Sequence, residues 1–167
     1  MAANVAFEIL YKEYYARVFG LCRRLLGSPT LAEDATQETF MRAYKYFKRY
    51  DTSQPFWRWI ATIANNHCID LLRGRQRIAD WIGSETEELD SLPAEDIGAL
   101  GQMISHEDSE RLNQAVEQLP DKYRVPLVLA YYNDASYDEI ATSLSTSRNH
   151  VGVLLLRARQ KLREELK

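Results

Sequence analysis

Cysteine, histidine and long apolar runs are all scarce in this chain of 167 residues. Its two cysteines, Cys22 and Cys68, have no metal-ligand spacing and are expected to be reduced thiols in a cytoplasmic protein. No apolar run approaches the roughly 20 residues that span a bilayer, so we expect no membrane insertion. The N-terminal stretch contains Glu8, Lys12 and Glu13 and therefore lacks the uninterrupted apolar segment of a signal peptide.

Signs of catalysis are missing as well. The three histidines, His67, His106 and His150, lie far apart in the sequence. No nucleophile elbow, glycine-rich phosphate loop or metal-ligand cluster accompanies them, so an enzyme, a metal site and a cofactor are not expected. The sequence contains no internal repeat, and we expect no sensory domain beyond Lys167.

The net charge of −3 conceals an uneven distribution of charge. Residues 1–79 contain 12 basic and 7 acidic residues, residues 80–108 contain 9 acidic and no basic ones, and residues 109–167 contain 9 basic and 8 acidic ones. The middle stretch also carries scattered glycine, serine and proline, which is typical of a linker that is extended or disordered when free. We therefore predict two small domains, 1–79 and 109–167, joined by an acidic linker.

Apolar residues recur at helical spacing through both domains, which predicts an all-α fold. In the first domain one helix ends at Gly27, and a second begins at Ser28-Pro29 and runs to about Tyr50. Residues 51–55 are typical of a turn, and a third helix is expected over about 56–77. The expected core side of the second helix includes Leu31, Ala35, Phe40, Ala43, Tyr44 and Phe47, and Phe56 and Trp59 are expected to pack inward from the third.

The second domain has the pattern of a helix-turn-helix. Ser136 and Glu139 form a capping box that opens a helix. A short turn over residues 145–147 leads to a long helix on which Val153 and Leu156 are predicted to face outward. Base-edge candidates near the start of this helix, followed by basic residues, favour DNA binding. An amphipathic helix whose charges only solvate it would show the same pattern, and the two outward apolar residues would then pack on a partner.

Motifs in both domains resemble the extracytoplasmic-function (ECF) sigma factors of bacterial RNA polymerase. Residues 31–44 read LAEDATQETFMRAY, which is similar to the core-binding helix of that family. The spacing of its promoter-melting helix recurs in Phe56, Trp59, Ile60, Ile63, Ala64, Asn66, Asp70 and Arg73. Its fourth conserved region is matched by Leu119-Pro120, by residues 136–141 and by residues 157–163. These blocks occur in the family's order and cover essentially the whole chain.

The resemblance implies that the protein binds core RNA polymerase, at the clamp helices of the largest subunit and at the flap, and directs it to double- and single-stranded promoter DNA. The implied polymerase contacts share one stripe of the second helix, opposite its core side: Asp34, Gln37, Glu38, Met41 and Arg42. The implied minus-10 contacts, which capture an unpaired base, are Asp51, Thr52, Ser53, Gln54, Trp57, Arg58 and Asn66. The implied minus-35 contacts are Arg148, Asn149, His150, Gly152, Val153, Leu156, Arg157 and Arg159.

The recognition helix departs from the family pattern. Where many members have a basic residue, a serine and an arginine after the valine matched by Val151, this chain has Gly152, Val153 and Leu154. Minus-35 specificity therefore cannot be transferred from relatives, and Arg148, Asn149 and His150 become the best candidates for direct readout.

The resemblance leads to two further expectations, and one alternative function stays open. An anti-sigma factor is expected to hold the free protein inactive. The acidic linker either threads through the polymerase toward the RNA exit path or is a plain tether. The alternative function is a helix-turn-helix regulator that binds DNA without polymerase and whose first domain senses a signal or dimerises.

Overall fold

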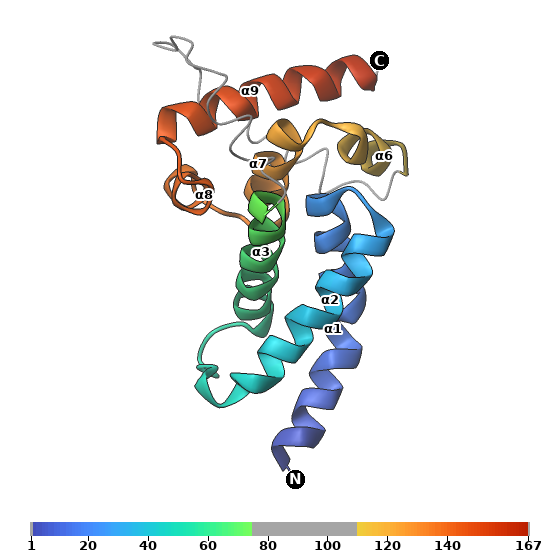
Figure 1. Cartoon of the computed structure of the whole chain (residues 1–167), viewed down its shortest axis with the longest axis vertical. Helices are drawn as coiled ribbons and strands as arrows, with labels where there is room; N and C mark the ends of the chain where they lie inside the picture. The colour runs from blue at the N-terminus through green and yellow to red at the C-terminus, as the bar shows by residue number, and fades with distance from the viewer. Residues whose placement is uncertain (1, 75–109, 167) are drawn as a thin grey trace. The chain divides into compact units, whose positions relative to one another are not determined.

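The computed structural model describes residues 2–74 and 110–166 (Figure 1). The expected linker, 80–108, lies outside these residues. The described residues form seven α-helices and one 3₁₀ turn, with no strand among them, which confirms the predicted all-α fold. They belong to two compact units, an N-terminal unit that ends at Leu71 and a C-terminal unit that begins at Leu72. In neither described stretch is any helix apolar and long enough to cross a membrane.

The N-terminal unit contains α1 (Ala2–Leu26), α2 (Pro29–Lys45), a short 3₁₀ turn (Phe47–Arg49) and all but the last three residues of α3 (Phe56–Gly74). Helices α1 and α2 pack side by side, as Figure 1 shows. Their tight connection depends on Gly27, whose φ of 70° is a left-handed conformation that side chains with a Cβ rarely adopt. The Ser28 hydroxyl then accepts the Leu31 amide at 3.3 Å, which caps α2 as predicted.

Small residues on α2 let it approach α1 closely, since Ala32, Ala35 and Ala43 are all fully buried. Tyr44, which we expected on the core side, is instead 54% exposed. Its ring stands against Phe7 of α1, and its hydroxyl donates a 2.9 Å hydrogen bond to the Asn4 side chain. A tyrosine fits this edge position because its ring is apolar and its hydroxyl needs a polar partner.

The two cysteines meet in the core of this unit. Cys22 of α1 and Cys68 of α3 are free thiols, both fully buried, and their side chains hydrogen-bond to each other. The hydrogen bond with Cys22 and the burial both raise the pKa of the Cys68 thiol, which therefore stays protonated at neutral pH. The pair packs as two small apolar side chains.

The C-terminal unit contains α6 (Glu110–Gln118), α7 (Asp121–Tyr132), α8 (Tyr137–Leu144) and α9 (Arg148–Glu165). Helix α9 packs against the other three. The core of the unit is built largely from Leu112, Val116, Leu127, Ile140, Leu144, Val151, Leu154, Leu155 and Leu162, all of which are 2% exposed or less. At the corner between α6 and α7, the buried Arg124 donates to the Leu119 carbonyl at 2.8 Å and pairs with Asp121.

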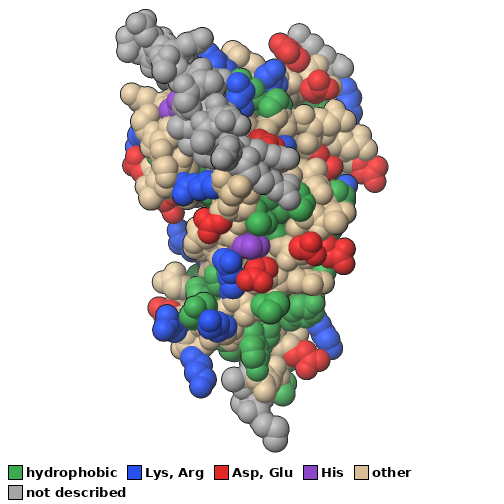
Figure 2. Space-filling view, in the orientation of Figure 1, with side chains coloured by type: hydrophobic (Ala, Val, Ile, Leu, Met, Phe, Trp, Pro, Cys, Tyr) green, Lys and Arg blue, Asp and Glu red, His purple; other side chains and the backbone are tan. Residues whose placement is uncertain are grey.

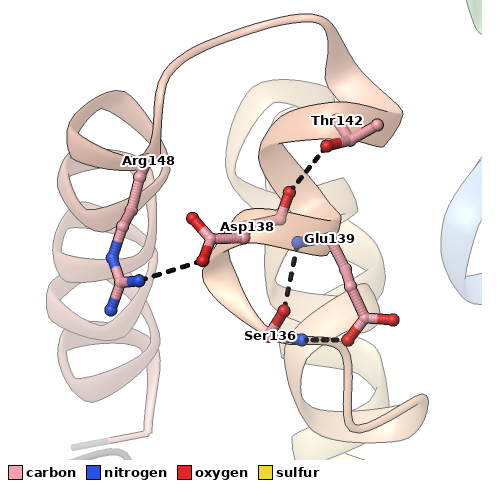
Figure 3. A network of polar contacts seen from close by, with 5 residues as sticks. All are labelled: Ser136, Asp138, Glu139, Thr142 and Arg148. Atoms are coloured by element: carbon pink, nitrogen blue, oxygen red, sulfur yellow. Dashed lines mark hydrogen bonds and ion pairs between the residues drawn. The ribbon is translucent and has the colours of Figure 1, made fainter.

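The predicted capping box at the start of α8 is confirmed (Figure 3). Ser136 Oγ accepts the Glu139 amide at 3.1 Å, and the Glu139 carboxylate accepts the Ser136 amide at 3.0 Å. Two backbone donors at the helix end are thereby satisfied reciprocally. This cap fixes where α8 begins, and so where the following turn and α9 start.

Replacing Ser136 with alanine is expected to lower the free energy of unfolding of the C-terminal unit by about 1 kcal/mol, because the Glu139 amide loses its acceptor. Urea denaturation of the full chain, followed by circular dichroism, measures the change. The matched control is Thr142→Ala, since that exposed hydroxyl only donates back to the Asp138 carbonyl. Thr142→Ala is expected to change the free energy of unfolding by no more than about 0.5 kcal/mol. Equal effects of the two substitutions would contradict a stabilising role for the cap.

Candidate functional site

The stripe predicted on α2 lies on its solvent side. Asp34, Gln37 and Met41 are exposed, and Glu38 and Arg42 are half-buried. Arg42 Nε contacts Glu38 Oε1 at 3.0 Å, an (i, i+4) ion pair that orders both side chains. We refer to these five residues as the α2 surface. Met41 is 68% exposed and has no core role, so its apolar side chain is available to a partner.

A hollow of about 370 Å³ lies at the C-terminal end of the α2 surface. It is lined by Glu38, Met41, Arg42, Lys45 and Tyr46. Tyr46 was not among the residues predicted from the sequence. It ends α2 and is 39% exposed, and Lys45 Nζ lies 5.5 Å from the centroid of its ring. An exposed thioether and an aromatic ring surrounded by charged groups resemble the apolar centre and polar rim of a protein–protein interface.

His67 of α3 lies close to the same surface. Burial first, and then the positive charge of Arg42, lower the pKa of His67, so its imidazole is neutral at neutral pH. His67 contributes a neutral, half-buried ring beside the Glu38–Arg42 ion pair.

The loop before α3 is exposed yet internally hydrogen-bonded. Asp51 Oδ1 accepts the Ser53 amide at 2.9 Å and the Ser53 hydroxyl at 2.7 Å, and the Gln54 amide donates to the Asp51 carbonyl at 2.9 Å. The hydrogen bonds from Ser53 lower the pKa of Asp51, which keeps the carboxylate ionised. The exposed side chains of Thr52 and Gln54 are thus presented on a shaped backbone.

An aromatic cluster holds both ends of this loop. The Tyr50 ring lies 5.0 Å from Trp59 and 5.5 Å from Phe56, and Phe47 lies 6.4 Å from Trp59 (centroid distances). Phe56 is buried, as predicted, whereas Trp59 is half-buried. Because residues before and after the loop share one cluster, the loop conformation is coupled to the packing of α3.

The structure does not bring Trp57 and Asn66 together. Trp57 is half-buried against α1, with the Arg17 guanidinium 3.9 Å from its ring centroid and the Tyr14 ring stacked at 6.4 Å. Asn66 is exposed nine residues later on α3, which is about two and a half helical turns and so the opposite side of the helix. Arg58 is exposed on its own turn beside the loop. Of the three residues of α3 that were predicted as minus-10 contacts, only Trp57 and Arg58 therefore lie next to the loop.

The start of α9 presents the polar residues predicted for base readout. Arg148 and Asn149 are exposed, and the Ser147 hydroxyl caps the helix by accepting the His150 amide at 3.1 Å. Arg148 Nη1 pairs with Asp138 Oδ2 of α8 at 3.1 Å, as Figure 3 shows. This ion pair links the two helices of the helix-turn-helix across their turn.

Further along α9 the exposure differs from the prediction. Val153, expected to face outward, is 3% exposed, Arg159 is 3% exposed and Gly152 is also buried. Leu156 and Arg157 are half-buried. The five residues 151–155 are all buried, and five consecutive residues cover the whole circumference of a helix. Residues 151–155 of α9 are therefore buried on every side of the helix, unlike the exposed Arg148 and Asn149 before them. A minus-35 contact by Gly152, Val153 or Arg159 stays a prediction and requires that these residues become exposed.

Two families of known proteins match this chain, one in each part of it. Residues 10–78 match the Sigma-70 region 2 family, and residues 109–162 match the Sigma-70 region 4 family. The ECF RNA polymerase sigma factor SigW of Bacillus subtilis (strain 168) is 32% identical over 167 residues, an alignment that covers 97% of this chain and 89% of the relative. SigM of the same organism is 32% identical over 163 residues, covering 95% and 94%.

A solved structure shares the fold. The sigma factor RpoE in complex with the anti-sigma factor NepR, from Bartonella quintana, aligns with a TM-score of 0.59 at 21% identity and covers 96% of each chain. Two family matches in this order, together with relatives of similar length, show the family. The chain belongs to the sigma-70 family, as an ECF sigma factor of bacterial RNA polymerase and not an enzyme in its own right.

Proposed function

We propose that the α2 surface is where this sigma factor binds core RNA polymerase, at the clamp helices of the largest subunit. Three exposed side chains, a neighbouring ion pair and the hollow beside Met41 support this assignment. Acidic groups such as Asp34 can pair with arginines of a partner, and Met41 supplies the apolar centre that strong interfaces need. The α2 surface is the single observation that carries the proposal, because it combines an exposed apolar side chain with charged neighbours on one side of α2.

The loop at 51–54, with Trp57 and Arg58, is proposed to hold the unpaired minus-10 strand. Its hydrogen-bonded backbone presents Thr52 and Gln54, whose polar side chains can read the edge of an extruded base. Asn66 lies on another side of α3, and we assign it to a separate contact further along the strand. Pre-organisation of the loop lowers the entropy that binding costs.

The helix-turn-helix is proposed to bind duplex DNA at the minus-35 element. Arg148 and Asn149 are exposed at the start of α9 and are assigned to base edges, with His150 beside them and Arg157 on phosphates. The proposed domains are 1–79 for core and minus-10 binding and 109–167 for minus-35 binding and the flap, joined by the acidic linker 80–108. The protein would act in the cytoplasm, where its polymerase is found.

Control by an anti-sigma factor is also proposed. RpoE, whose fold this chain shares, is solved in complex with such a factor, which supports an equivalent partner here. The α2 surface and the loop are exposed in the chain alone, so one partner that covers them would prevent polymerase binding. A cell that lacks any antagonist and still contains only inactive protein would contradict this part of the proposal.

The deciding experiment mixes the purified chain with bacterial core polymerase, measures co-elution, and maps run-off transcripts from a random promoter library. Co-elution with discrete start sites is expected, and the enriched upstream sequences would define both promoter elements. Duplex DNA binding without polymerase binding would overturn the proposal in favour of a helix-turn-helix regulator that acts alone.

A further inference from the structure

We infer that Arg17 of α1 binds a backbone phosphate of the unpaired minus-10 strand, and that Trp57 serves as the surface that orients its guanidinium. The inference rests on the proposed minus-10 role of the neighbouring loop. It extends the single-strand site from the loop and α3 onto α1, and the ligand it names is the phosphodiester group of single-stranded DNA.

The position of Arg17 is fixed by contacts between α1 and the first turn of α3. Its guanidinium carbon lies 3.9 Å from the ring centroid of Trp57, the second residue of α3 and the third after Gln54. Tyr14, one turn earlier on α1, stacks on Trp57 at 6.4 Å and contacts Phe56 at 5.1 Å. A residue from α1 is thereby held at the edge of the minus-10 loop.

Arg17 keeps its charge available. Glu13 lies four residues before it, the favourable order for an ion pair on a helix. Within the part of the chain that the structure describes, Arg17 nonetheless forms no ion pair and contacts Trp57 instead. The N–H donors of a guanidinium lie in its own plane, so contact of that plane with a ring leaves them free to bind phosphate. An uncompensated cation on an aromatic surface is a combination that suits a nucleic-acid backbone.

The charges around the loop favour the same ligand. Lys48 and Arg49 precede the loop and Arg58 follows it, and all three are exposed. Figure 2 shows basic side chains gathered over this end of the N-terminal unit. Within residues 47–58 the only acid is Asp51, whose carboxylate already accepts two hydrogen bonds from Ser53. A strand whose base enters the loop would run between cations on both sides, and Arg17 supplies the contact from α1.

The same contact changes the expected role of Trp57. A base can stack on an indole only where the ring is uncovered, and Arg17 occupies one face of this ring. Trp57 is thus a positioning residue that acts through Arg17, while the polar groups of the loop read the base. This separates a sequence-independent phosphate contact from sequence-dependent readout.

The test uses holoenzyme assembled from the full chain and core polymerase. Its ligand is a labelled single-stranded oligonucleotide that carries the minus-10 sequence mapped by run-off transcription. The dissociation constant is measured over a range of potassium chloride concentrations. Arg17→Gln is expected to weaken binding equally for minus-10 and scrambled sequences, and to reduce the slope of log K against log salt by about 0.7, the value for one phosphate contact on a single strand. Arg17→Lys is expected to keep the slope.

Three further variants make the outcome specific. Lys12→Gln removes the same charge from an exposed site on α1 where Lys12 pairs with Glu8, and is expected to leave the slope unchanged. Trp57→Leu is expected to reduce the slope in the same direction as Arg17→Gln, because the guanidinium loses the ring that orients it. An Arg17→Gln slope equal to that of Lys12→Gln would overturn the inference. If unsubstituted holoenzyme fails to bind the oligonucleotide, the proposed minus-10 function fails instead. If the double variant Thr52→Ala/Gln54→Ala weakens binding of the oligonucleotide but Arg17→Gln leaves the slope of log K against log salt unchanged, only the proposed role of Arg17 fails.

Discussion

Replacing Met41 with glutamate is expected to weaken binding to core RNA polymerase by at least about 30-fold, which corresponds to roughly 2 kcal/mol. Met41 lies on the α2 surface and is 68% exposed, so its replacement removes no core contact. Substitutions at such positions change stability by about 0.5 kcal/mol or less. In the complex, however, the new carboxylate would replace the apolar centre of the interface with a charge that must lose its water. Fluorescence titration of labelled chain with core polymerase measures the loss.

Ile9 provides a matched control for this substitution. It is 59% exposed on α1, so Ile9→Glu makes an equivalent change of an exposed apolar residue to an acid within the same unit. Ile9→Glu is expected to keep polymerase binding, and Met41→Leu is expected to keep most of it. Equal losses for the two glutamate variants would indicate a general effect of charge. If Met41→Glu binds core polymerase as tightly as the unsubstituted chain does, the α2 surface is not part of the polymerase interface.

Arg124→Leu is expected to lower the free energy of unfolding of the C-terminal unit by about 3–5 kcal/mol. Arg124 is 4% exposed, donates to the Leu119 carbonyl at 2.8 Å and pairs with Asp121. Its removal leaves a carbonyl without that donor and a largely buried carboxylate without its cation. A loss of this size is comparable with the whole stability of a small domain. Urea unfolding monitored by circular dichroism measures it, and duplex DNA binding should fall in parallel.

The exposed ion pair in the same unit is the control for this effect. Arg148 and Asp138 are paired at 3.1 Å, but their side chains are 66% and 72% exposed. Arg148→Leu is therefore expected to lower the free energy of unfolding of the C-terminal unit by less than about 1 kcal/mol. Polymerase binding at the α2 surface should persist in both variants, since that surface belongs to the other unit. If Arg124→Leu is no more destabilising than Arg148→Leu, the buried pair does not hold the α6–α7 corner.

Features that depend on neighbouring residues could be predicted from the sequence. The connection at Gly27 and Ser28 and the capping box at Ser136 were correct because each is formed within a few residues. The solvent-facing stripe on α2 was also correct, since helical periodicity alone separates it from Ala35 and Ala43. The family resemblance assigned roles to these surfaces, but the local geometry did not depend on it.

Features that depend on distant residues could not be predicted. Nothing in the sequence places Arg17 on Trp57, because that contact joins α1 to α3 and follows from the packing of both helices. The meeting of Cys22 and Cys68 has the same origin. Periodicity also misplaced Val153, since it assumes that one side of a helix faces solvent, whereas residues 151–155 of α9 are all buried. The packing of other helices against a recognition helix decides which of its residues are exposed.

The ion pair between Asp138 and Arg148 has a consequence for how this protein searches a chromosome. A chromosome offers on the order of a million or more non-specific sites that compete with a promoter. These sites attract a DNA-binding protein mainly through its uncompensated cations. In the unbound helix-turn-helix, Asp138 neutralises the first arginine of α9. The pair is exposed, so a phosphate or a base edge could replace the carboxylate at a cost of less than about 1 kcal/mol. If Arg148 contacts DNA as proposed, the carboxylate would slightly weaken each such contact, and so would shorten the residence of the helix-turn-helix on random DNA.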